Sequence, residues 1–171
     1  VSFRISGTQS PMSPQNATVA TLKTTSRYGY STSLATYVDL TAIAGGKLRG
    51  KLLWGLATPT AGSRSDGIVE LHNTAEVPAN GSLTFVLPND GWNLGAKPII
   101  TFQNPAGLSN EATWMPSSRT LVVVVRQPVP ASTDVHMVIK GVTAPPSSMA
   151  AGQGRVVSMT KNLKIMDGPS N

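Results

Sequence analysis

Cysteine is absent from this chain of 171 residues. Its absence excludes disulfides, zinc ribbons, iron–sulfur clusters and catalysis by a thiol. Long apolar stretches are missing as well, because the longest run, Leu121 to Val125, is far too short to cross a bilayer. The sequence therefore predicts no membrane span. It begins with Val1 rather than methionine, so we expect a processed product or a piece of a longer precursor.

Charged and aromatic residues are scarce. Only 13% of the residues are charged, about half the usual share, and 5% are aromatic. The formal net charge of +6 reflects 8 acids against 14 bases, which favours solubility and weak attraction to anionic polymers. With few aromatics and no basic N-terminal arm, we expect no nucleic-acid partner. Long helix-forming runs without glycine or proline are also lacking, which excludes helical bundles and coiled coils.

Turn residues are abundant, with 16 glycines and 13 prolines. Short apolar or alternating runs lie between turn pairs such as Asp66-Gly67, Asn80-Gly81 and Asp167-Gly168. Strands spaced roughly 10 to 15 residues apart are typical of sandwiches and jelly rolls. The sequence therefore predicts an all-β fold, an antiparallel β-sandwich of jelly-roll or immunoglobulin-like type with about ten short strands and little helix. The expected strands are Val1–Ser6, Thr18–Thr25, Ser33–Ala42, Lys47–Ala57, Gly67–His72, Ser82–Leu87, Pro98–Gln103, Arg119–Arg126, Asp134–Lys140 and Arg155–Thr160.

One run departs from the alternation of buried and exposed side chains. Leu121 to Val125 is apolar at every position, so this strand should be covered on both faces, by a long loop, a neighbouring subunit or a glycan layer. The three tryptophans, Trp54, Trp92 and Trp114, are expected in the core or at its rim. The other residues expected in a core between two sheets are Leu53, Ile68, Leu71, Leu83, Phe85, Ile100, Phe102, Val123, Val125 and Met137.

The beginning and the end of the chain share an internal repeat. Residues of the first copy recur 134 positions later in the second copy, each time after an alternating apolar strand. The matched pairs are Ile5 and Ile139, Gly7 and Gly141, Pro11 and Pro145, and Ser13 and Ser147. We therefore expect residues 1–46 to be the closing part of a preceding repeat and residues 47–171 to be the main β-sandwich module.

Turn and strand segments of this module are similar to those of a known group of proteins. The segments are Ala61-Gly62-Ser63, Ile68-Val69-Glu70-Leu71, Val77-Pro78-Ala79-Asn80-Gly81-Ser82, Leu83-Thr84-Phe85-Val86-Leu87-Pro88 and Ile139-Lys140-Gly141-Val142-Thr143-Ala144-Pro145. With them, the chain from Gly50 to Asn171 resembles tandem β-sandwich repeat modules of secreted, fibre-forming or cell-surface glycoproteins of algae and protists. The resemblance implies a structural role outside the cell or at its surface, and it brings no catalytic residues.

Two sequons provide acceptors for N-linked glycans. Asn16-Ala17-Thr18 and Asn80-Gly81-Ser82 both lie in turn-like stretches, where a glycan can project. If the protein is secreted, we expect covalent glycans at Asn16 or Asn80.

Residues suited to acid–base chemistry or metal binding are few. Glu70 and His72 stand two positions apart on one strand face, where they can form a site with Asp134 or His136. A solvated polar face is the expected interpretation. The sequence contains no phosphate-binding or dinucleotide-binding glycine motif and no serine nucleophile elbow. We therefore predict no catalytic residues, no metal, no cofactor and no enzymatic activity.

A short basic strand follows the expected domain boundary. Lys47, Arg49 and Lys51 alternate along it, so their side chains should project from one face. Such a face can bind phosphate groups, an acidic polysaccharide or an acidic patch of a neighbour. The alternative is a polar strand face that protects the sheet from aggregation.

The N-terminal strand predicts how the chain assembles. Val1, Phe3 and Ile5 alternate with polar residues, which is the pattern of a strand with one buried face. Addition of this strand to an open sheet edge of a neighbouring copy would join copies head-to-tail. The leading hypothesis is therefore a secreted, glycosylated structural subunit of an extracellular filament or surface fibre. Its expected partners are other copies of itself and glycans.

Two other functions fit the same composition. A viral jelly-roll coat protein is also rich in strands and basic, although the charge in this chain is scattered rather than gathered in a disordered arm. A carbohydrate-binding β-sandwich module would use Trp92 or Trp114 as a platform for a sugar.

Overall fold

The computed structural model describes residues 15–22, 25–30, 36–40, 42, 46–150 and 152–170. The chain divides into two compact units, Val1–Ala44 and Gly45–Asn171. We call the first the N-terminal unit and the second the sandwich. The repeat in the sequence placed the boundary after residue 46.

The N-terminal unit contains a two-stranded antiparallel sheet. Its strands, β1 (Thr18–Leu22) and β2 (Thr36–Leu40), pair over their full length. Both lie within strands expected from the sequence. The strand predicted at Val1–Ser6 lies outside the described residues.

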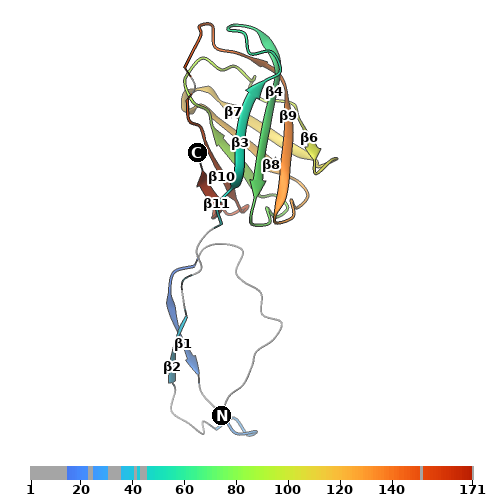
Figure 1. Ribbon diagram of the computed structural model, residues 1–171. Coiled ribbons are helices and arrows are strands. Elements are labelled where there is room, and N and C mark those ends of the chain that lie inside the picture. The colour runs from blue at the N-terminus through green and yellow to red at the C-terminus, as the bar shows by residue number, and fades with distance from the viewer. Residues whose placement is uncertain are drawn as a thin grey trace. The chain divides into compact units, whose positions relative to one another are not determined.

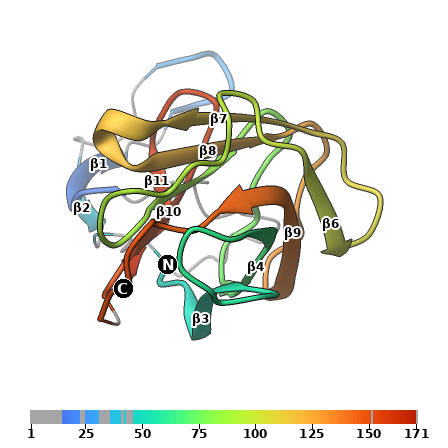
Figure 2. The same ribbon diagram turned by 90° about the horizontal axis from the view of Figure 1, so that it is seen from above.

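The second unit is a sandwich of two antiparallel sheets. Its strands are β3 (Arg49–Leu56), β4 (Arg64–Asn73), β5 (Ser82–Val86), β6 (Ile100–Asn104), β7 (Asn110–Met115), β8 (Thr120–Val125), β9 (Thr133–Thr143), β10 (Arg155–Met159) and β11 (Ile165–Ser170), with a 3-10 turn at Pro116–Ser118. Five strands form one sheet in the order β11-β10-β5-β8-β7, and four form the other in the order β3-β4-β9-β6 (Figure 1). Seen from above, the sheets form two layers, with β7, β8 and β10 in one and β3, β4 and β9 in the other (Figure 2). The predicted antiparallel β-sandwich is confirmed.

Alternation of buried and exposed side chains builds the core. In β8, Leu121, Val123 and Val125 are fully buried between the sheets, whereas Val122 and Val124 on the other face are half-buried. Within the chain the inner face is therefore fully covered and the outer face only in part, and cover of the outer face by a neighbouring subunit or a glycan layer stays a prediction. Cross-strand neighbours explain the partial cover, since Val122 stands between a threonine of β5 and a threonine of β7 in the register.

Most residues expected in the core are buried there. They are Leu71, Leu83, Phe85, Ile100, Phe102, Val123, Val125 and Met137. Ile68 is half-buried instead, because it alternates on β4 with Val69, which takes the inner face. The side chain of Leu53 lies outside the described residues.

Two strands of the sandwich, β7 and β11, were not expected from the sequence. On β7 the buried side chains are Ala112 and Trp114, and the residues before each of them, Glu111 and Thr113, are polar and exposed, so little aliphatic pattern marks the strand. On β11 the stretch Asp167-Gly168-Pro169 has the composition of a turn, yet it continues a strand at the edge of the sheet.

The glycine and proline of the second repeat copy have structural roles. Gly141 has φ = +66°, and a Cβ atom there would lie 2.7 Å from the Arg64 guanidinium, so any other residue would be strained and would displace Arg64. Pro145 accepts a hydrogen bond from the Gly62 amide at 2.8 Å, which brings two of the resembling segments together. The matching residues of the first copy lie outside the described residues.

Candidate functional site

The residues predicted to drive assembly belong to the N-terminal unit. Val1, Phe3 and Ile5 lie outside the described residues, so their role stays a prediction. Within the described part of this unit, two features stand out: the exposed face of β1, and a turn that presents tyrosines.

β1 has the same pattern as β10, a strand of the sandwich. The sequence Thr-Val-Ala-Thr-Leu of β1 matches Arg-Val-Val-Ser-Met of β10, and each strand pairs with the strand that follows it. In β10, Val156 and Ser158 are fully buried. The matching residues of β1 are exposed, with Val19 at 54% and Thr21 likewise open to solvent. The N-terminal unit thus exposes side chains of a kind that the sandwich buries.

The turn between β1 and β2, which we call the tyrosine turn, spans Ser26 to Tyr30. The Ser26 amide donates to the Tyr30 carbonyl at 2.7 Å, and Gly29 closes the turn with φ = +84°. Tyr28 and Tyr30 are 70% and 75% exposed. Arg27 lies over the Tyr28 ring, with its guanidinium carbon 4.7 Å from the ring centroid. The turn therefore presents two aromatic rings and a cation to solvent.

A cavity of about 410 Å³, which we call the tryptophan cavity, opens at one end of the sandwich. Trp54 and Trp92 meet edge-to-face in its wall, with ring centroids 5.6 Å apart and planes at 89°. Pro59, Pro88 and Pro145 also line it, and none of the described residues around it carries a charge. The Trp92 Nε1 donates to the Pro88 carbonyl at 2.9 Å, whereas the buried Nε1 of Trp54 has no hydrogen-bond partner in the described part of the chain.

The tryptophans differ in what they can contact. Trp114 is only 4% exposed and belongs to the core, so a sugar platform at Trp114 was wrong. Trp92 lines the cavity, where a ligand can reach it. The sequence did not reveal the cavity, because Trp54 on β3 and Trp92 in the loop after β5 meet only through the packing of the two sheets.

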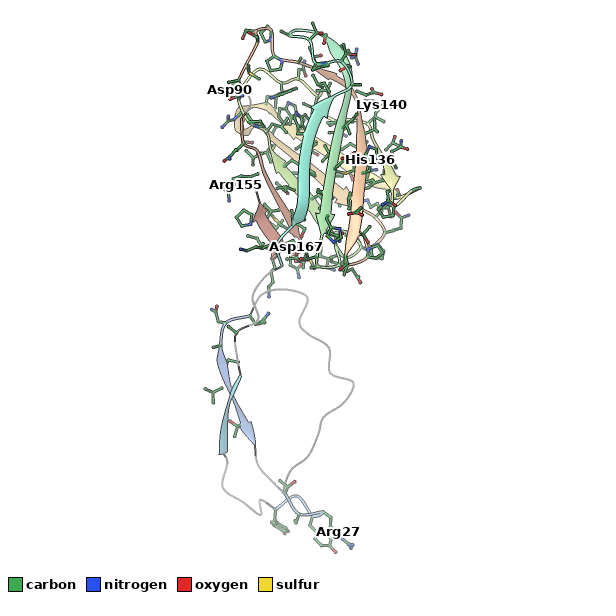
Figure 3. The ribbon with its side chains drawn as sticks, in the orientation of Figure 1. Arg27, Asp90, His136, Lys140, Arg155 and Asp167 are labelled. Carbon is green, nitrogen blue, oxygen red and sulfur yellow. The ribbon has the colours of Figure 1, made fainter. Side chains whose placement is uncertain are left out.

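The tryptophan cavity lies at the end of the sandwich opposite to the one where the chain joins β3. In the register of β3 with β4, Arg49 stands opposite His72, and Leu56 stands opposite Gly67. Gly46 comes just before the Arg49 end of β3, whereas Leu56, at the other end of β3, lines the cavity. Figure 3 shows Asp90, in the loop that carries Trp92, at one end and Asp167 at the other.

A buried carboxylate holds the end where the chain joins β3. Asp167 on β11 is fully buried and accepts hydrogen bonds from the Thr74 hydroxyl at 2.6 Å, the Thr74 amide at 3.0 Å and the Ala75 amide at 2.9 Å. Gly46 forms a parallel bridge with Asp167, and a Cβ atom at Gly46 would lie 1.8 Å from the carboxylate. We call this arrangement the Asp167 clamp. The sequence did not predict it, because Asp-Gly indicates a turn.

The candidate acid–base residues do meet on the outer face of the four-stranded sheet. The register places Glu70 opposite His136 and His72 opposite Asp134, and His72 Nδ1 lies 2.7 Å from Asp134 Oδ1. Asn104 donates from its side chain to the Asp134 carbonyl. The Asp134 side chain is 85% exposed, as expected for a solvated polar face. Among the described residues, no group of three or more histidines, cysteines or carboxylates is placed to hold a metal ion. That the chain is not an enzyme stays a prediction.

The predicted basic face is described only in part. Lys47 is exposed, and the register places Arg49 opposite His72. The side chains of Arg49 and Lys51 lie outside the described residues. What this strand binds stays a prediction.

Both predicted glycan acceptors lie at the surface. Asn16 and Thr18 are exposed. Asn80 is exposed with φ = +61°, and its Oδ1 accepts from Arg126 at 3.0 Å. Ser82 of the second sequon is buried. Both positions are therefore open for a glycan at the asparagine, and its attachment stays a prediction.

One surface carboxyl has a clearly shifted pKa. Lys140 donates to Asp66 at 2.6 Å, and the Gly141 amide donates at 3.3 Å. These hydrogen bonds, with that from Lys140 the stronger influence, lower the pKa of Asp66 below its usual value.

Comparisons with models of known families, with curated proteins and with solved structures find no match. Within the described part of the chain, no helix is long and apolar enough to cross a membrane.

Proposed function

We propose that the chain is a structural subunit that assembles head-to-tail with copies of itself into an extracellular filament or surface fibre. The carrying observation is the N-terminal unit, whose β1 repeats the pattern of β10 but exposes Val19, where β10 buries Val156. A two-stranded sheet is at best marginally stable in water, so this unit gains stability by completing another sheet.

The acceptor is an open sheet edge of a neighbouring copy. The two edges of the five-stranded sheet are already partly paired. At β11 the Gly46 amide donates to the Met166 carbonyl at 2.9 Å, and at β7 the Trp114 amide donates to the Ala96 carbonyl at 3.0 Å. β3, with eight residues, is the longer edge strand of the four-stranded sheet and offers the most backbone groups to an added strand. The basic residues along it would limit pairing with unrelated strands.

Electron microscopy and sedimentation of the full chain test this proposal. The intact protein should form linear filaments, whereas Phe3→Asp with Ile5→Asp should leave folded monomers. A stable monomer of the intact chain at high concentration would contradict the filament, and so would closed shells, which would support a viral coat protein.

A carbohydrate-binding module is the second candidate, because Trp92 lines a cavity. That cavity has the polar side chains of Thr60, Asn89, Ser147 and Ser148 but no charged one for the hydroxyls of a sugar. Self-assembly also accounts for the exposed side chains of β1, so it is the better supported function.

A further inference from the structure

We propose that the tryptophan cavity of one copy binds the tyrosine turn of the next copy. This inference rests on the proposed self-assembly and names a contact that would direct it. The occupant of the cavity is then a second copy of this chain.

The chemistry of the cavity favours an aromatic ring that carries a polar group. Two indoles and three prolines line it, together with the polar side chains of Thr60, Asn89, Ser147 and Ser148. A tyrosine supplies both a ring that packs against the indoles and a hydroxyl that can form hydrogen bonds with these polar side chains.

The tyrosine turn has the matching properties. Tyr28 and Tyr30 are among the most exposed large side chains of the described residues, and the tight turn at Gly29 keeps them close together. Tyrosine and arginine are enriched in the energetic centres of protein interfaces. Arg27 lies over the Tyr28 ring and not over the Tyr30 ring, so this cation covers neither face of Tyr30.

The difference between the turn and the cavity makes the contact directional. The sandwich joins the rest of the chain at Gly46, beside the Asp167 clamp, and the cavity lies at its other end. The turn and the cavity are different surfaces, so their contact is heterologous and leaves one unpaired turn and one unpaired cavity on every pair. Such a contact adds copies without limit unless a ring closes.

Each contact is expected to be weak alone. Burial of two tyrosine side chains removes about 300 to 500 Å² of surface from water, against about 1,200 Å² for the smallest stable interfaces. Assembly should therefore need a threshold concentration, or strand addition at the same junction, which raises the effective concentration of the turn.

Two variants test the two sides of the contact, the turn and the cavity, one at a time. Tyr28→Ser with Tyr30→Ser removes the rings, and Ala61→Lys places a cation beside the cavity at an exposed turn residue, where it also repels Arg27. Neither change touches the core. Each variant alone should raise the concentration needed for filaments by about tenfold or more. Mixed together, the tyrosine-free copy still offers its cavity and the Ala61→Lys copy its turn, so pairs should form by this contact without further growth.

Matched controls are Ile99→Ser, which removes an aliphatic side chain that is 69% exposed, and Ala131→Lys, which adds a cation at an exposed loop away from the cavity. Both should assemble like the intact chain. If the tyrosine and Ala61 variants also assemble like the intact chain, the inference is overturned while strand addition stands.

A peptide measurement tests the cavity without filaments. The heptapeptide Thr-Ser-Arg-Tyr-Gly-Tyr-Ser, added to the full chain, should change the tryptophan emission saturably, and the change should vanish in Ala61→Lys. The same peptide with serine for both tyrosines should have no effect. No response to the tyrosine peptide overturns the inference, and a saturable response to a neutral glucose oligosaccharide instead would assign the cavity to carbohydrate. If the intact chain stays monomeric but binds the peptide, the filament fails and the cavity assignment survives.

Discussion

The strands β1 and β10 have similar sequences but lie in different surroundings. β10 pairs with β5 on one side and β11 on the other, and its Val156 is buried between two sheets. Within the described residues β1 pairs with β2, and its Val19 is exposed. The alternating pattern of a strand therefore does not bury its apolar side chains by itself. A neighbouring strand and a second sheet must also pack against it. The incomplete pair is the part of the molecule with most to gain from a partner.

Aspartate at the matched valines should have the largest effect on this comparison. Val156→Asp buries an unpaired charge and should lower the free energy of unfolding of the sandwich by more than about 4 kcal/mol. Val19→Asp should change it by less than about 0.5 kcal/mol, because Val19 is exposed in the other unit. Urea unfolding followed by tryptophan fluorescence measures both.

If Val156→Asp does not fold, Val156→Ala provides the same comparison with an expected loss of about 2 kcal/mol. Equal losses at the two valines would show that β1 is as deeply buried as β10.

The Asp167 clamp is the second difference between the strand pairs. Asp167→Asn keeps the shape of the side chain but replaces an acceptor with a donor that faces the Thr74 and Ala75 donors. The sandwich should lose about 2 to 4 kcal/mol. Asp39→Asn, at the aspartate of β2, should leave the unfolding of the sandwich unchanged. A loss below about 0.5 kcal/mol for Asp167→Asn would mean that the clamp does not stabilise β11.

These differences also mark what the sequence could predict. The alternation of apolar and polar residues on β5 and β9 identified the sandwich and much of its core, because the buried positions follow directly from strand geometry. β11 was missed, since Asp167 and Gly168 are turn residues unless a carboxylate finds donors on another loop. The tryptophan cavity was missed for the same reason: Trp54 and Trp92 are distant in sequence, and tertiary packing alone brings them together. Sites built by long-range contacts leave no local pattern.

The glycine shared by the two repeat copies allows a smaller test. Gly141→Ala forces a side chain into the left-handed region and against Arg64, so the sandwich should lose about 1 to 2 kcal/mol. Gly7→Ala should leave the unfolding of the sandwich unchanged but weaken filament formation, if Gly7 has the same role in the N-terminal unit. Thermal unfolding and sedimentation of both variants measure the two effects. Intact filaments in Gly7→Ala would count against structural equivalence of the copies.

The smallest expected effect concerns an ion pair that the first repeat copy lacks, since Ser6 stands where the second copy has Lys140. The pKa of Asp66 is lowered in the folded protein, so the carboxylate form contributes stability above the usual value of 3.8, and this contribution is lost as the pH falls through the lowered pKa. Lys140→Gln should therefore destabilise the sandwich slightly at neutral pH and not at all in strong acid. Both side chains are partly exposed, so added salt should shrink the difference. Urea unfolding of the intact chain and the variant across pH measures it, with Lys97→Gln, an exposed lysine, as the control. A difference that persists in acid would assign the role of Lys140 to its packing rather than to its charge.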